Sequence, residues 1–191
     1  HVNRLPVLLL PGDVFATRAP DPVLQQVESF ADGTVSANDC LRSISRYFDR
    51  ITRPEQLLQA LPKAMSVLTD PADCGPVTLG LCQDVQAEAW DYPESFFAPR
   101  VWHMRRILSD VAELSRAIEI LKSAKRPMIV AGGGVRYSGA SQALTAFADA
   151  AGIPVAATQA GKSSLVEAHP MYVGSLGVTG ASAANNLAAK A

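Results

Sequence analysis

Three consecutive glycines, Gly132, Gly133 and Gly134, follow an apolar segment, and such a turn lets the backbone approach a phosphate group. The dinucleotide-binding pattern G-x-G-x-x-G would use the first and third of them, but its last position holds Tyr137. The acidic residue that contacts a ribose about 20 residues further on is also missing, because that region reads Thr158-Gln159. We therefore expect a tight turn at the end of a parallel strand, either packed on a neighbour or of the nucleotide type, with no NAD bound.

Two further patterns are incomplete versions of catalytic or phosphate-binding motifs. Gly161-Lys-Ser-Ser164 is similar to the end of a P-loop, but the glycine required five residues earlier is replaced by Ala156. His169 precedes a proline, which is typical of a loop or packing residue rather than a base. No pair of histidines has metal-ligand spacing, and no G-x-S-x-G elbow is present. The residues alone predict no catalytic group in this chain and no metal site.

The composition excludes several classes of protein. Against 17 Lys and Arg stand 18 Asp and Glu, so the net charge is −1 and a sequence-independent nucleic-acid binder is not expected. No apolar run approaches the roughly 20 residues of a membrane-spanning helix. Cys40, Cys74 and Cys82 are odd in number and widely spaced, which favours free thiols in a cytoplasmic protein. Because the chain begins with His1 and almost directly enters a strand, we expect an internal part of a longer protein.

The first half of the chain contains strand and helix patterns separated by loops. The apolar run Leu5–Pro11 predicts a strand buried on both faces, and 16–38 predicts a long loop. Thr52-Arg-Pro-Glu55 predicts a helix start with a capping box, and Pro62 predicts a kink or a fresh start in that helix. Alternating apolar residues in Val77–Leu81 predict another strand.

A second alternation follows the linker-like stretch 83–106. Asp110 is the expected cap of a helix whose apolar stripe comprises Leu114, Ala117, Ile118, Leu121 and Ala124. Pro127–Ala131 and Pro154–Thr158 predict strands, and Gly152 ends the helix between them. Strand, helix and strand in this order predict a parallel sheet. The predicted fold class is α/β, with three-layer parallel-sheet domains.

The order of these segments resembles the thiamin-diphosphate enzymes of the acetolactate synthase and pyruvate oxidase type. Cys74–Val85 looks like the end of their pyrimidine-binding domain, although Cys82 stands where proline is usual. Ala117–Ala191 looks like the start of their Rossmann-like central domain, with Gly161-Lys162 and His169-Pro170 among the matching pieces. The resemblance implies a C-terminal part of the first domain in residues 1–90, a linker in 91–108 and an N-terminal part of the central domain in 109–191.

Longer segments resemble one subfamily, the hydrolases that open a cyclic trihydroxy dione in myo-inositol catabolism. They include Leu8–Val14, Gln83–Pro93, Arg100–Arg106, Gly132–Ser138 and Thr158–Lys162. This resemblance implies cleavage of the carbon–carbon bond between two ketones, giving 5-deoxyglucuronate. An acetolactate synthase-type carboligase, whose central domain can carry FAD, remains an alternative. A non-catalytic nucleotide-binding or assembly module is the other.

The resemblance also implies thiamin diphosphate and Mg²⁺ in the full-length enzyme, with the protein orienting the cofactor. The glutamate that activates the cofactor would lie before His1, and the Gly-Asp-Gly metal motif would lie in a third domain. Gly12-Asp13-Val14 lacks the second glycine of that motif. Only Gln25 and Gln26 remain as cofactor-binding candidates on the pyrimidine-binding domain. We therefore expect this chain alone to be inactive and to bind no cofactor, and the full-length enzyme to be a homo-oligomer.

Overall fold

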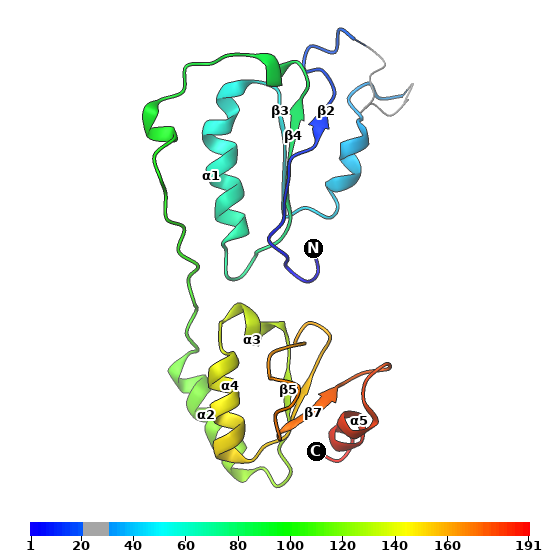
Figure 1. Ribbon diagram of the computed structural model, residues 1–191, viewed down its shortest axis with the longest axis vertical. Helices are drawn as coiled ribbons and strands as arrows, with labels where there is room; N and C mark the ends of the chain where they lie inside the picture. Colours follow the sequence, from blue (N-terminus) through cyan, green and yellow to red (C-terminus); the bar gives the residue numbers. More distant parts are fainter. Residues whose placement is uncertain (21–30) are drawn as a thin grey trace. The chain divides into compact units, whose positions relative to one another are not determined.

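The computed structural model describes residues 1–20 and 31–191, and the chain divides into two compact units (Figure 1). Unit 1 comprises His1–Arg105 and unit 2 comprises Arg106–Ala191. Each unit contains its own parallel sheet.

The sheet of unit 1 has β4 (Val77–Cys82) as its central strand. β3 (Tyr47–Ile51) pairs with one edge of β4, and β1 (Leu8–Leu9) and β2 (Gly12–Asp13) pair with the other. All of these pairings are parallel, so the carboxyl ends of the strands lie at one edge of the sheet. The sequence pattern predicts β4 but not β3.

β1 and β2 are two halves of one strand, which Pro11 interrupts. Leu8 lies opposite Val77 and Gly12 lies opposite Leu81, so both halves keep the same register on β4. Proline has no N–H to donate, which breaks the ladder for one bond. Its carbonyl still accepts a hydrogen bond of 2.8 Å from the Leu81 amide. The predicted strand therefore continues past the proline. The predicted burial on both of its faces is wrong, because Leu8 and Leu10 remain 38% and 53% exposed.

The helix α1 (Leu57–Leu68) connects β3 to β4 and packs along the sheet (Figure 1). Pro62 does not end it, so the predicted fresh start is wrong. The helix buries small residues against the strands, which removes apolar surface from water. The buried cluster comprises Ile51, Ala60, Ala64, Val77, Leu79, Cys82 and Val85.

The start of this helix differs from the predicted capping box. A short 3₁₀ turn, η2 (Pro54–Gln56), precedes α1. The side-chain oxygen of Gln56 accepts hydrogen bonds from the Thr52 amide at 2.6 Å and the Arg53 amide at 3.0 Å. The capping side chain is therefore Gln56 and not the predicted Glu55. The observed cap lies one residue later than the sequence pattern predicts.

Two more short elements extend unit 1. η1 (Ala37–Leu41) begins at the end of the predicted loop 16–38 and continues beyond it. η4 (Glu94–Phe96) belongs to an aromatic cluster in which Tyr92 stacks on Phe96, with ring centroids 5.3 Å apart. The Tyr92 hydroxyl also donates a hydrogen bond of 2.6 Å to the Pro54 carbonyl. These contacts attach the segment that follows the sheet to the start of α1.

Unit 2 contains a sheet of three parallel strands in the order β5 (Ile129–Ala131), β6 (Val155–Ala157) and β7 (Tyr172–Ser175). The helix α4 (Ser141–Ala151) connects β5 to β6 and ends at Gly152, which has the left-handed φ of 63° that favours glycine. The predicted strand–helix–strand order is present.

Two short helices flank the strands of unit 2. α3 (Gly133–Tyr137) begins directly at the glycine triplet, and α5 (Ser182–Ala188) follows β7. The sequence pattern predicts neither α5 nor β7. The buried residues of this unit's core cluster are Ala131, Ala148, Val155 and Leu165.

The helix α2 (Val111–Ser123) begins as the sequence predicts but buries none of its residues. The Asp110 carboxylate caps it by accepting hydrogen bonds from the Ala112 and Glu113 amides at 2.9 and 3.1 Å. Its apolar stripe remains accessible, with Leu114 49% exposed. Among the described residues, no helix combines the length and apolarity needed to cross a bilayer.

Candidate functional site

The carboxyl edge of the unit 1 sheet gathers the charged residues that are best placed for function. Asp13 is the last residue of β2, Cys82 is the last residue of β4, and Arg50 is the penultimate residue of β3. Open parallel sheets bind ligands outside the carboxyl ends of their strands. This edge is therefore the candidate site of unit 1.

A buried ion pair joins the two outer strands at this edge. The Nε of Arg50 donates a hydrogen bond of 2.7 Å to Oδ2 of Asp13, whose side chain is fully buried. The Nη2 of Arg50 donates to the Ser36 hydroxyl at 2.8 Å and to Asp39 Oδ1 at 3.2 Å. Burial alone would lower the pKa of Arg50, but the bond and charge of Asp13 outweigh it and raise the pKa. The guanidinium is thus a permanent cation between two carboxylates.

The central strand makes room for this pair with a glycine. A Cβ added to Gly80 would lie 2.6 Å from Oδ2 of Asp13, closer than a real Cβ approaches another atom. The Asp13 carboxylate therefore lies directly against the backbone of β4. Any larger residue at position 80 would displace it from Arg50.

The segment around η1 is held to the same edge. The Ser36 amide donates to Asp39 Oδ2 at 2.7 Å, and the Asn38 side chain donates to the Gly12 carbonyl at 2.6 Å. Burial raises the pKa of Asp39, but the hydrogen bonds from the Ser36 amide and Arg42 lower it by more. The pKa of Asp39 is therefore below its usual value. Asp39 remains a carboxylate and binds both Arg50 and Arg42.

Asp84 holds the loop that follows β2. Its carboxylate accepts hydrogen bonds from the Ala16 amide at 2.8 Å, the Thr17 amide at 3.1 Å and the Val85 amide at 3.1 Å, at the start of η3 (Val85–Ala87). Burial raises the pKa of this carboxyl, but the three amides outweigh burial and lower it. Asp84, the aspartate of the segment that resembles the family's Pro-x-Asp-Val, therefore fixes the loop that follows β2.

The two predicted cofactor-binding glutamines, Gln25 and Gln26, lie outside the described residues. Cys82 lies at the centre of the edge, but burial and the charge of Asp13 raise the pKa of its thiol to about 11. A thiol with this pKa is a poor nucleophile near neutral pH. The described part of the edge supplies fixed charges and hydrogen-bond donors rather than a reactive group.

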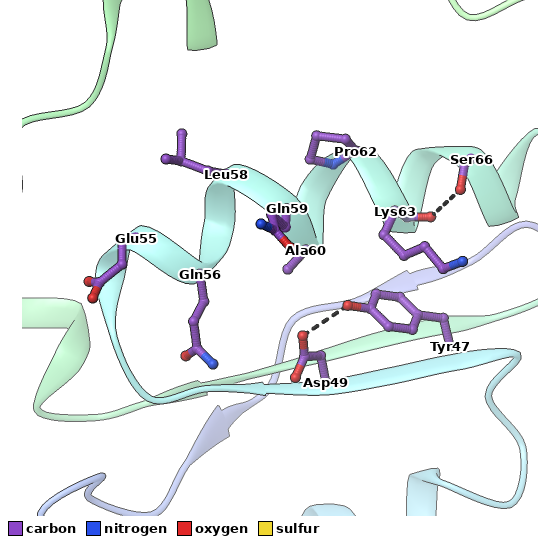
Figure 2. Close-up of a pocket in the computed structure, with 10 residues that line it drawn as sticks. All are labelled: Tyr47, Asp49, Glu55, Gln56, Leu58, Gln59, Ala60, Pro62, Lys63 and Ser66. Atoms are coloured by element: carbon purple, nitrogen blue, oxygen red, sulfur yellow. Dashed lines mark hydrogen bonds between the residues drawn. The ribbon is translucent and has the colours of Figure 1, made fainter.

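A wider hollow of about 1070 Å³ lies between α1 and the outer strand β3 (Figure 2). Tyr47 donates its hydroxyl hydrogen to Asp49 at 2.8 Å, and burial followed by this bond raises the pKa of Tyr47 to about 12. The hydroxyl therefore stays protonated near neutral pH, and the other charged side chains that line the hollow are Glu55 and Lys63. We do not assign chemistry to this groove.

In unit 2, the glycine triplet follows β5 as predicted, but it makes no cradle of its own. Gly132 has an extended conformation, a Cβ on Gly133 would lie 3.1 Å from the Tyr137 ring, and nothing lies within 4 Å of a Cβ on Gly134. The tightest requirement falls on Gly161 instead, where a Cβ would overlap the Ala131 carbonyl oxygen. The loop after β6 therefore packs directly against the end of β5.

This loop is not a P-loop, and His169 is not placed as a base. Arg136 donates to the carbonyl of Lys162 at 3.0 Å, so the loop is tied to α3. His169 Nε2 lies 3.2 Å from Asp149 Oδ1, while its Nδ1 accepts a hydrogen bond of 3.2 Å from the Met171 amide. Both ring nitrogens of His169 therefore have polar partners within unit 2, which agrees with the structural role that its position before a proline predicts.

The described side chains do not provide the ligands of the metal and cofactor that the resemblance implies. Across residues 1–20 and 31–191, no group of three or more His, Cys, Asp or Glu is arranged to hold a metal ion. Asp13, the acid of the incomplete Gly-Asp motif, is occupied by Arg50. The described residues therefore do not fit a Mg²⁺–diphosphate site, and no chemical step is assigned to them through that group.

The sequence signal for these functional residues was partial. Asp13 follows an apolar run, which marks the end of a strand, but nothing near Arg50 distinguishes it from a surface arginine. Ser36 and Asp39 lie in a stretch without periodicity. Only the Ser-x-x-Asp spacing, typical of a capped turn, could have indicated them.

Comparison with known proteins gives matches to thiamine pyrophosphate enzymes and to one group of hydrolases. The family model of the thiamine pyrophosphate enzyme central domain matches residues 114–191. The chain is 54% identical over 189 residues to the 3D-(3,5/4)-trihydroxycyclohexane-1,2-dione hydrolase of Geobacillus thermodenitrificans, covering 99% of this chain and 30% of that protein. The protein of the same name from Bacillus cereus strain AH820 is also 54% identical, with 29% of its length covered.

A solved structure agrees with these matches. It is described as a thiamin diphosphate-dependent enzyme isolated from Mycobacterium smegmatis, with a TM-score of 0.67 and 26% identity, covering 92% of this chain and 32% of that one. The chain spans about 30% of the length of the curated relatives it matches. These matches show that residues 114–191 carry the thiamine pyrophosphate enzyme central domain and that the whole chain is similar to the named hydrolases and to a thiamin diphosphate-dependent enzyme.

Proposed function

We propose that the protein carrying this chain is a thiamin-diphosphate-dependent hydrolase that cleaves the carbon–carbon bond between the two ketones of 3D-(3,5/4)-trihydroxycyclohexane-1,2-dione. The observation that carries the proposal is the 54% identity to hydrolases of that name over 189 residues, which runs through both units. The product is 5-deoxyglucuronate, and the pathway is myo-inositol catabolism.

We assign residues 1–90 to the pyrimidine-binding domain, 91–108 to a linker and 109–191 to the central domain. The division of the chain after Arg105 and the family match from residue 114 support this assignment. In this arrangement Asp13, Arg50 and Asp84 shape the carboxyl edge of the first domain. They orient its loops, and they carry no proton in the reaction.

Mg²⁺, a homo-oligomeric state and a cytoplasmic location belong to the same proposal. Cys40, Cys74 and Cys82 are all free, which agrees with a reducing compartment. Metal analysis and sedimentation of the full-length protein test the first two.

Turnover of the full-length protein on the cyclic dione tests the function. We expect ring opening that requires thiamin diphosphate, and no carboligation of pyruvate. Formation of acetolactate from pyruvate without ring opening would instead support the carboligase alternative. Binding of FAD or ADP without either activity would support a nucleotide-binding module.

A further inference from the structure

A strip of unit 1, residues 88–105, carries charges of opposite sign in its two halves. The half before Phe97 contains acids and no cation, and the half after it contains cations and no acid. Arg105 is a cation of the second half, and the other charged groups follow a spacing of three residues in both directions from Phe97. They are Glu94, Asp91 and Glu88 before it, and Arg100, His103 and Arg106, the first residue of unit 2, after it.

Phe97, at the centre of this pattern, presents its ring to solvent and is 70% exposed. Its ring makes edge contacts with Phe96 and Tyr92, with centroids 5.4 and 5.9 Å away. A hydrogen bond from the Tyr92 hydroxyl ties this aromatic cluster to the start of α1. Val101 and Met104, which are 78% and 61% exposed, extend the apolar surface. A supported aromatic ring that remains exposed is typical of the centre of a protein interface.

The charges of the strip are available to a partner. Among the described residues, the ion pairs involve none of its exposed side chains Glu88, Asp91, Glu94 and Arg100. A nucleic acid or an anionic membrane would be attracted to one half of the strip and repelled by the other. A surface with the same two halves in reverse order complements both. A second copy of the chain, related by a two-fold axis, supplies that surface.

We propose that the strip contacts the strip of a second copy of this chain about a two-fold axis at Phe97. Such an axis brings residue i of one copy to residue j of the other, and residue j to residue i. Glu94 then faces the partner's Arg100, Asp91 faces the partner's His103, and the two Phe97 rings meet at the axis. The inference rests on the proposed homo-oligomeric state and names a surface that contributes to it.

Cross-linking of the full-length protein tests this contact directly, whatever other interfaces hold the oligomer together. Ala98→Cys places an exposed thiol next to the axis in both copies, so a short bismaleimide should link two chains. The control is Glu167→Cys, an exposed position of unit 2 outside the strip, and both variants carry Cys40→Ser to remove an exposed native thiol. Ala98→Cys should form covalent dimers at least about tenfold faster than the control, because the axis raises the effective concentration of the second thiol.

Charge reversal shows whether the paired side chains belong to two copies. Added to Ala98→Cys, either Glu94→Arg or Arg100→Glu should slow cross-linking roughly tenfold, because like charges then face each other. Co-expression of the two reversed chains should restore cross-linking between them, since each cation of one chain then faces an acid of the other. Mixing cannot restore a contact made within one chain. Glu167→Arg, a matched charge reversal outside the strip, should leave the rate unchanged.

Three results would each overturn the inference. They are cross-linking of Ala98→Cys no faster than that of the control, reversals that leave the rate unchanged, and co-expression that restores nothing. Phe97→Ser should also slow the reaction, because it removes the ring at the axis, and an unchanged rate would contradict the position of that axis. A wild type that sediments as a monomer would overturn both the contact and the homo-oligomeric state. Ring opening of the dione by the same preparations tests the hydrolase assignment separately.

Discussion

Replacing Arg50 by Met removes the cation from the buried ion pair of unit 1. Asp13 is fully buried, so the variant would keep a carboxylate in the core without a cationic partner. Removing one partner of a buried pair costs about 3–5 kcal/mol, because the remaining charge is left uncompensated. The hydrogen bonds to Ser36 and Asp39 are lost as well. We expect the free energy of unfolding of unit 1 to fall by about 3–5 kcal/mol.

Urea unfolding followed by tryptophan fluorescence measures this loss. Trp90 and Trp102 are the two tryptophans of the chain, and both lie in unit 1, so their emission reports on the unit that contains the pair. With a slope near 2 kcal/mol/M, the unfolding midpoint should fall by about 2 M urea. The control is Arg53→Met, because this side chain is 75% exposed and lies 4.0 Å from Glu55. An exposed pair contributes at most about 1 kcal/mol.

A double-mutant cycle with Asp13→Asn completes the test. The asparagine removes the buried charge, so adding it to Arg50→Met should recover part of the lost stability. A loss below about 1 kcal/mol in Arg50→Met, equal to that of Arg53→Met, would refute the reasoning. So would strict additivity of the Asp13 and Arg50 substitutions.

Three further substitutions or measurements test the packing at the two sheet edges. Gly80→Ala should destabilise unit 1 by about 1–3 kcal/mol in the same urea assay, because the added methyl group overlaps the buried carboxylate of β2, and a wild-type midpoint would contradict this. Gly161→Ala should markedly lower the Tm of unit 2 because its Cβ overlaps a carbonyl oxygen of β5, whereas Gly134→Ala, with open space around it, should be neutral. At pH 8, Cys82 should react with iodoacetamide far more slowly than the exposed Cys40, and its rate should increase as the pH rises toward its pKa of about 11. Mass spectrometry measures both rates. Equal rates for the two thiols at pH 8 would contradict the burial of Cys82.

Local sequence patterns predict a large part of the fold. Period-two apolar residues identify β4, and apolar runs next to glycine or proline identify β5 and β6. The caps at Asp110 and Gly152 mark a helix start and a helix end because each is a short-range hydrogen-bond or φ requirement. Motif order over the whole chain is sufficient to indicate the enzyme family.

The elements that the sequence pattern does not predict depend on their neighbours. β3 reads Tyr-Phe-Asp-Arg-Ile, and its two central charges make it unlike a buried strand. In the structure this strand pairs with β4 along its whole length, and Arg50 is neutralised by Asp13 across the sheet. Short strands such as β7 likewise form only when a neighbouring strand is in place. The helix α2 differs from these strands. Its apolar periodicity predicts the helix correctly but does not predict that the apolar residues remain exposed.

The sequence by itself indicated the resemblance to thiamin-diphosphate enzymes, the α/β alternation and the incomplete glycine motifs, because these depend on the order and spacing of nearby residues. The tertiary structure alone decided which charges meet. Asp13 and Arg50 are 37 residues apart and lie on strands that do not pair with each other. They meet because both strands run parallel to β4 and Gly80 leaves room between them. Register and the space left by one missing side chain cannot be read from residue types.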